Sequence, residues 1–209
     1  MNSIEKLAEI FRHFPGIGPR QAKRFVYYLL TRNRGAIDEL IKNISELKNE
    51  MCVCSECGRF FQNKNIENKI CDICSDENRD HSLLMIVPRD SDLESVEKHS
   101  DWNGVYFVLG GTVPILEKNP EKKIRDQELK ILVEKRVNDL KEIILAMNWN
   151  PEGENTAEFV RHLIEETLRQ AQGPKHSIKI SVLGKGLSMG TELEYADTET
   201  MKNALKNRA

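Results

Sequence analysis

Four cysteines in two matched pairs constrain this chain more than any other feature of its sequence. Cys54-Ser-Glu-Cys57 and Cys71-Asp-Ile-Cys74 are two Cys-x-x-Cys knuckles separated by thirteen residues. Each knuckle lets two thiolates converge on one ion at about 2.3 Å, and two knuckles complete a tetrahedron of sulfur. The spacing therefore predicts one structural Zn²⁺ held by Cys54, Cys57, Cys71 and Cys74, with no position open for a substrate.

Two disulfides are the alternative use of these cysteines. The N-terminal sequence Met1-Asn-Ser-Ile-Glu does not resemble a secretory signal, so we expect a cytoplasmic protein, in which disulfides are rare. Cys52 precedes the first knuckle and is expected to remain a spare thiol. We also expect Phe60 and Phe61 to pack beside a zinc ribbon that is too small to have a core of its own.

Composition and charge exclude two broad classes of protein. The chain of 209 residues is 39% hydrophobic and 31% charged, and no apolar run approaches the ~20 residues that a membrane span requires. Its formal net charge of −2 excludes a uniformly basic nucleic-acid-binding protein. We therefore expect a protein that is not membrane-embedded, and any DNA-binding surface on it must be local.

A local basic stretch does occur between residues 11 and 37. It contains no Asp or Glu, and its basic residues are Arg12, Arg20, Lys23, Arg24, Arg32 and Arg34. The segment Phe14-Pro-Gly-Ile-Gly-Pro19 interrupts two helical patterns, which predicts a helix, a hairpin and a second helix. Gly16 and Gly18 permit a tight turn with exposed backbone N–H groups, and Pro19 suits the first turn of the second helix.

The turn and the basic residues together predict a phosphate-binding site. A helix N-terminus favours anions, and Arg20 and Arg24 share one helix face beside it, with Lys23 adjacent. A plain helix–helix connector with a solvated basic face is the alternative. We favour a helix-hairpin-helix that binds DNA phosphates without reading bases.

A third apolar pattern predicts a further helix after the hairpin. We expect this helix to belong to the core, and its apolar positions are Ala36, Ile37, Leu40, Ile41, Ile44 and Leu47.

After Cys74 the pattern changes to strands alternating with helices. Strands are predicted at 83–87, 104–109, 142–147 and 177–183, and helices at 91–99, 125–140 and 156–170. This order predicts an α/β fold, a parallel sheet flanked by helices. Ligands bind such sheets at the carboxyl ends of the strands, here at residues 88–92 and 148–153. The alternative is two polar loops that only cap helices, with Asp92 or Asn155 as an N-cap.

Taken in order, these features resemble one family, the bacterial recombination mediator RecR. The resemblance rests on four segments: Phe14–Arg24, Cys54–Cys74, Val105–Gly111 with Asn148–Thr156, and Gly190–Asp197. It implies a helix-hairpin-helix domain at 1–50, a four-cysteine zinc finger at 51–80, a Toprim domain at 81–180 and a C-terminal segment at 181–209. The chain departs from the family pattern at Pro88, where the resemblance leads us to expect an acidic residue.

The resemblance implies a non-enzymatic DNA-binding mediator of recombination and repair. Such a protein acts with RecO and RecF to load RecA onto single-stranded DNA, and it forms a homo-oligomer. Asn148 and Glu152, near the end of the third strand, are the residues expected to dock partners.

Toprim domains in topoisomerases and primases hold Mg²⁺ with a strand-end Glu and an Asp-x-Asp pair. Here the strand ends offer Pro88 and Asn148, and one carboxylate alone binds a hard cation weakly, so we expect no catalysis. The alternative is a metal-dependent Toprim enzyme that cleaves or joins DNA with Asp90, Asp92 and Glu152. A zinc-dependent interaction module without DNA binding is a third possibility, but it leaves the basic stretch unexplained.

Overall fold

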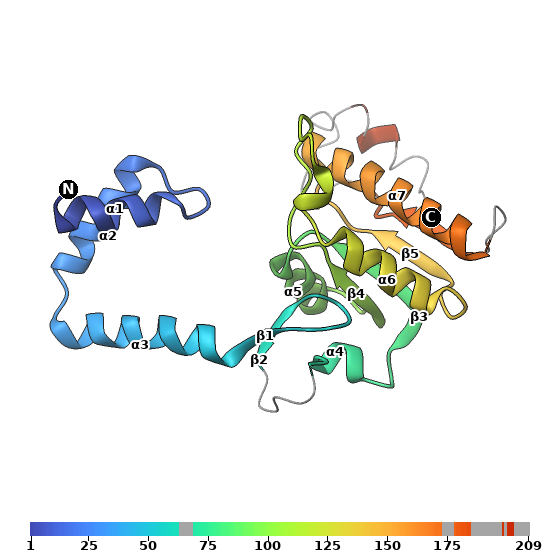
Figure 1. The fold of residues 1–209 in the computed structure, drawn as a ribbon, viewed down its shortest axis with the longest axis horizontal. Helices are drawn as coiled ribbons and strands as arrows, with labels where there is room; N and C mark the ends of the chain where they lie inside the picture. Colours follow the sequence, from blue (N-terminus) through green and yellow to red (C-terminus); the bar gives the residue numbers. More distant parts are fainter. Residues whose placement is uncertain (63–68, 173–177, 185–197, 199, 203–209) are drawn as a thin grey trace. The chain divides into compact units, whose positions relative to one another are not determined.

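The computed structural model describes residues 1–62, 69–172, 178–184, 198 and 200–202 (Figure 1). The chain divides into two compact units, Met1–Met51 and Cys52–Ala209. The centre of the finger loop at 63–68 and the closing segment expected at 190–197 lie outside the described residues. Within the described part, no helix has both the length and the apolar character needed to cross a membrane.

The first unit begins with two helices that pack on each other. In α1 (Ser3–Arg12) the Asn2 side chain accepts a hydrogen bond from the Glu5 N–H, and the Glu5 carboxylate accepts one from the Asn2 N–H. This reciprocal cap satisfies two backbone donors at the helix start. The second helix, α2 (Pro19–Leu30), follows the predicted hairpin and starts with its proline. The core between α1 and α2 is formed by Ala8, Ala22 and Val26.

The third helix, α3 (Arg34–Glu50), forms as predicted but is not part of a core. The Asn33 side chain caps it by accepting a hydrogen bond from the Ala36 N–H at 2.9 Å. No residue of α3 is buried, and its apolar side chains are 42–61% exposed at Leu40, Ile41, Ile44 and Leu47. The prediction that this stripe belongs to the core is therefore wrong, because helical periodicity marks an apolar face without identifying what covers it.

The second unit is built on a four-stranded parallel sheet of order β4-β3-β5-β6. Its strands are β3 (Asp80–Val87), β4 (Gly104–Val108), β5 (Glu142–Leu145) and β6 (Lys179–Val182). Between them lie α5 (Asp90–His99), the short 3₁₀ helix η1 (Pro120–Lys122), α6 (Asp126–Arg136) and α7 (Pro151–Gln172). The predicted α/β fold with a parallel sheet flanked by helices is confirmed.

Alternation of side chains along the strands decides what covers each face of the sheet. One face packs against α6 and α7 (Figure 1) and carries Leu84, Ile86, Val105 and Phe107. The opposite face packs against α5 and the four-cysteine segment, and it carries Met85, Val87, Tyr106 and Val108. The cysteine segment is therefore one of the layers that bury the sheet.

The four-cysteine segment consists of a small hairpin and a short helix. Strands β1 (Met51–Val53) and β2 (Phe60–Gln62) pair with each other, and α4 (Asp72–Ser75) begins directly after Cys71. Phe61 is buried as expected, whereas Phe60 is 52% exposed, because neighbouring residues of a strand face opposite sides. The segment lacks a core of its own but shares that of the sheet.

Candidate functional site

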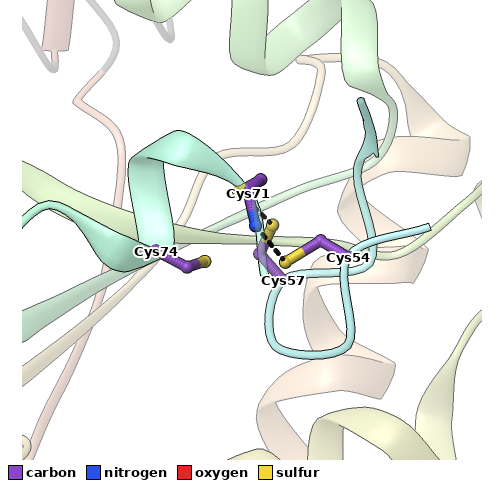
Figure 2. A group of neighbouring side chains, drawn as sticks. All are labelled: Cys54, Cys57, Cys71 and Cys74. Carbon is purple, nitrogen blue, oxygen red and sulfur yellow. Dashed lines mark hydrogen bonds between the residues drawn. The ribbon is translucent and has the colours of Figure 1, made fainter. Parts of the chain in front are cut away.

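The four predicted metal ligands converge from the two knuckles (Figure 2). Their sulfur atoms all lie within 4.8 Å of one another, and the sulfurs of Cys57 and Cys71 are 3.6 Å apart. A tetrahedral ion with metal–sulfur bonds of about 2.3 Å separates its sulfurs by about 3.8 Å. The arrangement therefore fits one metal ion with four thiolate ligands.

Local backbone geometry shapes the first knuckle. Gly58 has a φ of 74°, a left-handed value that favours glycine, and its N–H donates to the Cys54 carbonyl at 3.0 Å. The N–H of Cys71 donates to the Cys54 sulfur at 3.4 Å. Hydrogen bonds from the neighbouring thiols, that of Cys57 first, lower the pKa of Cys54. These contacts favour the thiolate of Cys54, the form that binds a metal, whereas hydrogen bonds among the same thiols and burial raise the pKa of Cys57 and of Cys74.

The four predicted metal ligands are largely shielded from solvent. Cys54, Cys57 and Cys71 are at most 2% exposed, and Cys74 is half-buried. Cys52 lies outside the group of four and is half-buried, in agreement with its prediction as a spare thiol. A buried, four-sulfur site has the closed form of a structural metal centre.

Polar contacts fasten the first knuckle to the sheet and to α6. The Cys57 carbonyl accepts a hydrogen bond from the Val108 N–H at 2.7 Å. Glu56, 17% exposed, accepts hydrogen bonds from Lys135 at 2.6 Å and from Arg136 at 2.9 Å. Burial by itself raises the pKa of Glu56, but these two cations outweigh it and lower that pKa. The knuckle is therefore held by ion pairs as well as by its sulfurs.

Arg125 also contacts both the first knuckle and the end of β4. Its guanidinium donates to the Val108 carbonyl at 2.9 Å. It lies so close to Gly58 and Gly110 that a Cβ on either glycine would sit 3.1–3.2 Å from it. Both glycines have positive φ, at 74° and 83°. Side chains at these positions would strain the backbone and displace the arginine.

A second polar cluster joins the end of the finger to α5 and β4. Arg79 donates to the Glu97 carboxylate at 2.9 and 2.6 Å and to the Gly104 carbonyl at 3.0 Å. The Tyr106 hydroxyl donates to Glu97 at 2.6 Å. Hydrogen bonds from Arg79 and then from Tyr106 lower the pKa of Glu97, against the opposing effect of burial. The sequence did not single out Glu97 or Glu56 as functional residues, because nothing in the neighbouring sequence reveals their partners.

The hairpin before α2 has the open backbone that the sequence predicts. Gly16 has a φ of 74°, which the turn requires, whereas Gly18 has an ordinary φ of −82° as the N-cap of α2. A Cβ on Gly18 would meet no atom within 4 Å. In the described part of the chain, the N–H groups of Gly18, Arg20 and Gln21 have no acceptor. This end of α2 therefore presents free donors to an anion.

The predicted DNA-binding side chains are exposed on α2. Among the described residues, Arg20, Lys23 and Arg24 form no ion pair. Arg24 makes one weak contact within the helix, to the Gln21 side chain at 3.4 Å. By contrast, Arg12 is paired with Glu9 at 2.8 Å. The three predicted DNA-binding cations are therefore exposed and without an acidic partner in the described part of the chain.

At the carboxyl edge of the sheet, the three acids of the predicted enzyme alternative are engaged elsewhere. Asp90 accepts a hydrogen bond from the Phe60 N–H at 2.7 Å, and Asp92 accepts one from the Arg89 N–H at 3.1 Å. Glu152 accepts one from the Thr112 hydroxyl. Among the described residues, the four cysteines are the only group of three or more His, Cys, Asp or Glu whose ligand atoms lie together.

At the carboxyl edge of the sheet, the residue at which the last long helix begins also differs from the prediction. Helix α7 begins at Pro151, not at 156, because Asn150 accepts a hydrogen bond from the Gly153 N–H at 2.7 Å and caps it. A side chain on Gly153 would collide with the Asn148 carbonyl. Asn155, one of the two predicted caps, donates instead to the Val113 carbonyl at 3.0 Å. Glu152 therefore lies in the first turn of a helix, while Asn148 is exposed beside it.

The second predicted cap, Asp92, also has a different place. It lies three residues inside α5 and accepts from the N–H of Arg89, which is the N-cap residue of that helix. Pro88 directly follows β3, is buried, and offers no side-chain ligand. The first strand end therefore supplies no free carboxylate to a metal ion.

Comparisons with known proteins agree with this arrangement. Residues 4–48 match the helix-hairpin-helix of RecR, residues 82–183 match the Toprim domain, and residues 186–209 match the C-terminal part of RecR. The chain is 35% identical over 209 residues to the recombination protein RecR of Bifidobacterium adolescentis, covering 99% of this chain and 95% of that protein. It is 36% identical over 207 residues to the recombination protein RecR of Staphylococcus aureus, covering 98% and 96%.

Proposed function

The chain belongs to the RecR family of recombination proteins, and from this premise we propose that it is a non-enzymatic, DNA-binding mediator of recombination and repair. One observation carries the proposal. Arg20, Lys23 and Arg24 are exposed without an acidic partner in the described part of the chain, beside the free N–H groups that begin α2.

Binding of the DNA backbone follows from this geometry. The phosphates lie against the N–H groups at Gly18, Arg20 and Gln21, and the arginines of the same helix face neutralise their neighbours. The absence of a side chain on Gly18 leaves room for the backbone of the DNA to approach. Contacts of this kind read no bases, so the binding is independent of sequence.

The metal has a structural role in this proposal. Cys54, Cys57, Cys71 and Cys74 hold one Zn²⁺, whose binding free energy stabilises the fold of the cysteine segment. That segment is a layer on the sheet, so the ion also stabilises the second unit. We assign the four functional parts to 1–50, 51–80, 81–180 and 181–209.

Partner proteins and self-association complete the proposal. The family points to RecO and RecF as partners, to the loading of RecA onto single-stranded DNA, and to action in the cytoplasm. We assign partner docking to the sheet edge at Asn148 and Glu152, the first of which is exposed. A homo-oligomer accords with the exposed apolar stripe of α3, since a second subunit can cover it.

A salt titration of DNA binding tests the proposal. Each phosphate neutralised contributes about −0.9 to the slope of log K against log salt for duplex DNA. Replacing both arginines, Arg20→Ala with Arg24→Ala, is expected to flatten the slope by about 2 per bound subunit and to weaken all sequences alike. The matched control is Arg34→Ala with Lys42→Ala, which removes the same charge from α3, where both cations already have acidic partners.

The result is interpretable only if the variants remain folded. Because all four mutated side chains are exposed, we expect melting temperature and zinc content to stay at wild-type values. A folded, zinc-loaded arginine variant that binds DNA with the wild-type affinity and slope would show that the hairpin is not the DNA-binding surface. The loop at 118–123, which is rich in lysine, would then be the next candidate.

A further inference from the structure

Helix α2 carries two adjacent exposed tyrosines beyond its arginines. Tyr27 is 56% exposed and Tyr28 is 54% exposed. The Tyr28 ring already has a partner, because the Arg32 guanidinium lies over it at 4.0 Å from the ring centroid. Among the described residues, the Tyr27 ring has neither an aromatic nor a cationic partner. It is a bare aromatic face in a basic environment.

Tyr27 lies on the same face of the helix as the two arginines. At 3.6 residues per turn, Arg20, Arg24 and Tyr27 fall within an arc of about 60°. This arc is opposite Ala22 and Val26, the residues that α2 contributes to the core. Along the helix axis Tyr27 is about 4.5 Å from Arg24. A ligand that is bound by Arg24 can therefore also contact the ring of Tyr27.

The face of α2 formed by Arg20, Arg24 and Tyr27 is complementary to a ligand in which anionic groups lie close to flat aromatic rings. Between residues 11 and 37 there are six basic residues and no acid, so charge complementarity favours a polyanion. Nucleic acid combines phosphates with aromatic bases, and aromatic side chains stack on bases without regard to sequence. In a duplex the bases are paired and stacked inside, where a ring lying beside the backbone does not reach them. An unpaired base is free to turn outward.

We propose that Tyr27 stacks on an unpaired base next to the phosphates held by Arg20 and Arg24, so that this face of α2 prefers single-stranded to duplex DNA. The inference rests on the proposed function and adds to it the form of DNA that is bound. The competing occupant is the same face of a second copy. That arrangement would bring Arg20 and Arg24 against like charges with no acid on the face to offset them.

The test compares affinities for a thymine homopolymer and for a duplex of equal length. Tyr27→Ala is expected to weaken binding to the single strand roughly ten-fold or more, the effect of losing one base stack. The ratio of single-strand to duplex affinity should fall by about the same factor. The salt slope should not change, because no phosphate contact is lost. Tyr27→Phe keeps a ring and should keep the ratio.

Tyr28→Ala is the matched control, since it removes an equally exposed tyrosine whose ring is already covered by Arg32. It should leave the affinity ratio within about two-fold of wild type, well short of the loss of one base stack. A direct readout comes from Tyr27→Trp and Tyr28→Trp. Stacking should quench the added tryptophan fluorescence on binding the homopolymer at position 27 and not at position 28. Circular dichroism and light scattering confirm that the variants keep their fold and assembly.

Two results would overturn the inference while leaving the proposed function intact. One is a Tyr27→Ala variant that keeps the wild-type ratio although the Arg20 and Arg24 double variant has lost binding to both forms of DNA. The other is a Tyr27→Ala variant whose loss of binding accompanies a change in oligomeric mass, which would assign the ring to a subunit interface. If the Arg20 and Arg24 double variant binds DNA like wild type, the result contradicts the proposed function, and the inference about Tyr27 is then contradicted as well.

Discussion

The carbonyl oxygen of Cys57 accepts a hydrogen bond from the N–H of Val108 at 2.7 Å, which joins the first Cys-x-x-Cys knuckle to the last residue of β4. The cysteine segment and the sheet thus share a backbone hydrogen bond as well as a hydrophobic cluster. Loss of the metal is therefore expected to disturb the whole second unit.

Removing one zinc ligand should unfold more than the knuckle. We expect Cys71→Ser to lose the ion and to lower the melting temperature of the protein by more than about 10 °C. The binding free energy of a structural zinc is on the order of 10 kcal/mol, and each kcal/mol lost shifts a domain of this size by roughly 2–4 °C. Metal analysis and thermal melting followed by circular dichroism measure both effects.

Cys52→Ser is the control for that experiment, because Cys52 is not one of the four converging thiols. It should retain one zinc per chain and melt within about 2 °C of wild type, as expected for a change of no more than about 0.5 kcal/mol. Freshly purified protein without zinc, or a Cys71→Ser variant as stable as wild type, would contradict the assignment of the metal site.

The carboxylate of Glu97 should stabilise the second unit in a pH-dependent way. Because Glu97 accepts hydrogen bonds from Arg79 and Tyr106, Glu97→Gln is expected to cost roughly 1–3 kcal/mol of unfolding free energy at pH 7. Glu94→Gln is the matched control, since Glu94 lies exposed on the same helix. Urea denaturation of the three proteins measures the difference.

The sign of the pH dependence follows from the lowered pKa of Glu97. A carboxyl whose pKa is lower in the folded state than its ordinary value of 4.5 stabilises the fold above that value. This contribution is lost as pH falls through the folded-state pKa. The difference between wild type and Glu97→Gln should therefore be constant from pH 7 to about pH 5 and shrink below pH 4.5. A difference that grows on acidification would contradict the assignment.

The carboxyl edge of the sheet should be catalytically inert. Asp90 and Asp92 each accept a hydrogen bond from a backbone N–H group and Glu152 accepts one from a hydroxyl. Among the described residues these three carboxylates form no cluster that could replace the water shell of Mg²⁺. Incubation with Mg²⁺ or Mn²⁺ should leave supercoiled, nicked and primed DNA unchanged on gels. Nicking that follows the protein through purification and disappears in Glu152→Ala would favour the metal-dependent Toprim enzyme instead.

The apolar stripe of α3 should carry part of the self-association that we propose. Ile41→Glu with Ile44→Glu places two charges on a face that is 57% exposed at both positions in the single chain. We expect a smaller mass by light scattering and no loss of helix content, since the stripe is exposed and belongs to no core cluster among the residues that the structure describes. Lys42→Glu, on the opposite side of α3 by helical geometry, should keep the wild-type mass. An unchanged mass in the double variant would place the subunit contact elsewhere.

Much of the fold and of both candidate sites is predictable from the sequence because the responsible signals are local. The spacing within and between the two Cys-x-x-Cys knuckles predicts the converging sulfurs. Gly16 and Pro19 predict the hairpin and the start of α2, because backbone conformations depend on side chains only a few residues apart. The continuous apolar run from Leu83 to Val87 indicates a buried strand, and the order of strands alternating with helices predicts a parallel sheet flanked by helices.

Long-range contacts decided the rest. Asp90 is a free carboxylate by sequence, yet it accepts from the N–H of Phe60, thirty residues earlier in the chain. The stripe of α3 has the same periodicity as a core helix and remains exposed. Periodicity and spacing are properties of neighbouring residues, whereas the partner of an apolar face or a buried acid is chosen when distant segments pack together. For this reason the sequence by itself determined the two cysteine pairs and the hairpin, and only the tertiary structure decided that the cysteine segment forms a layer of the sheet.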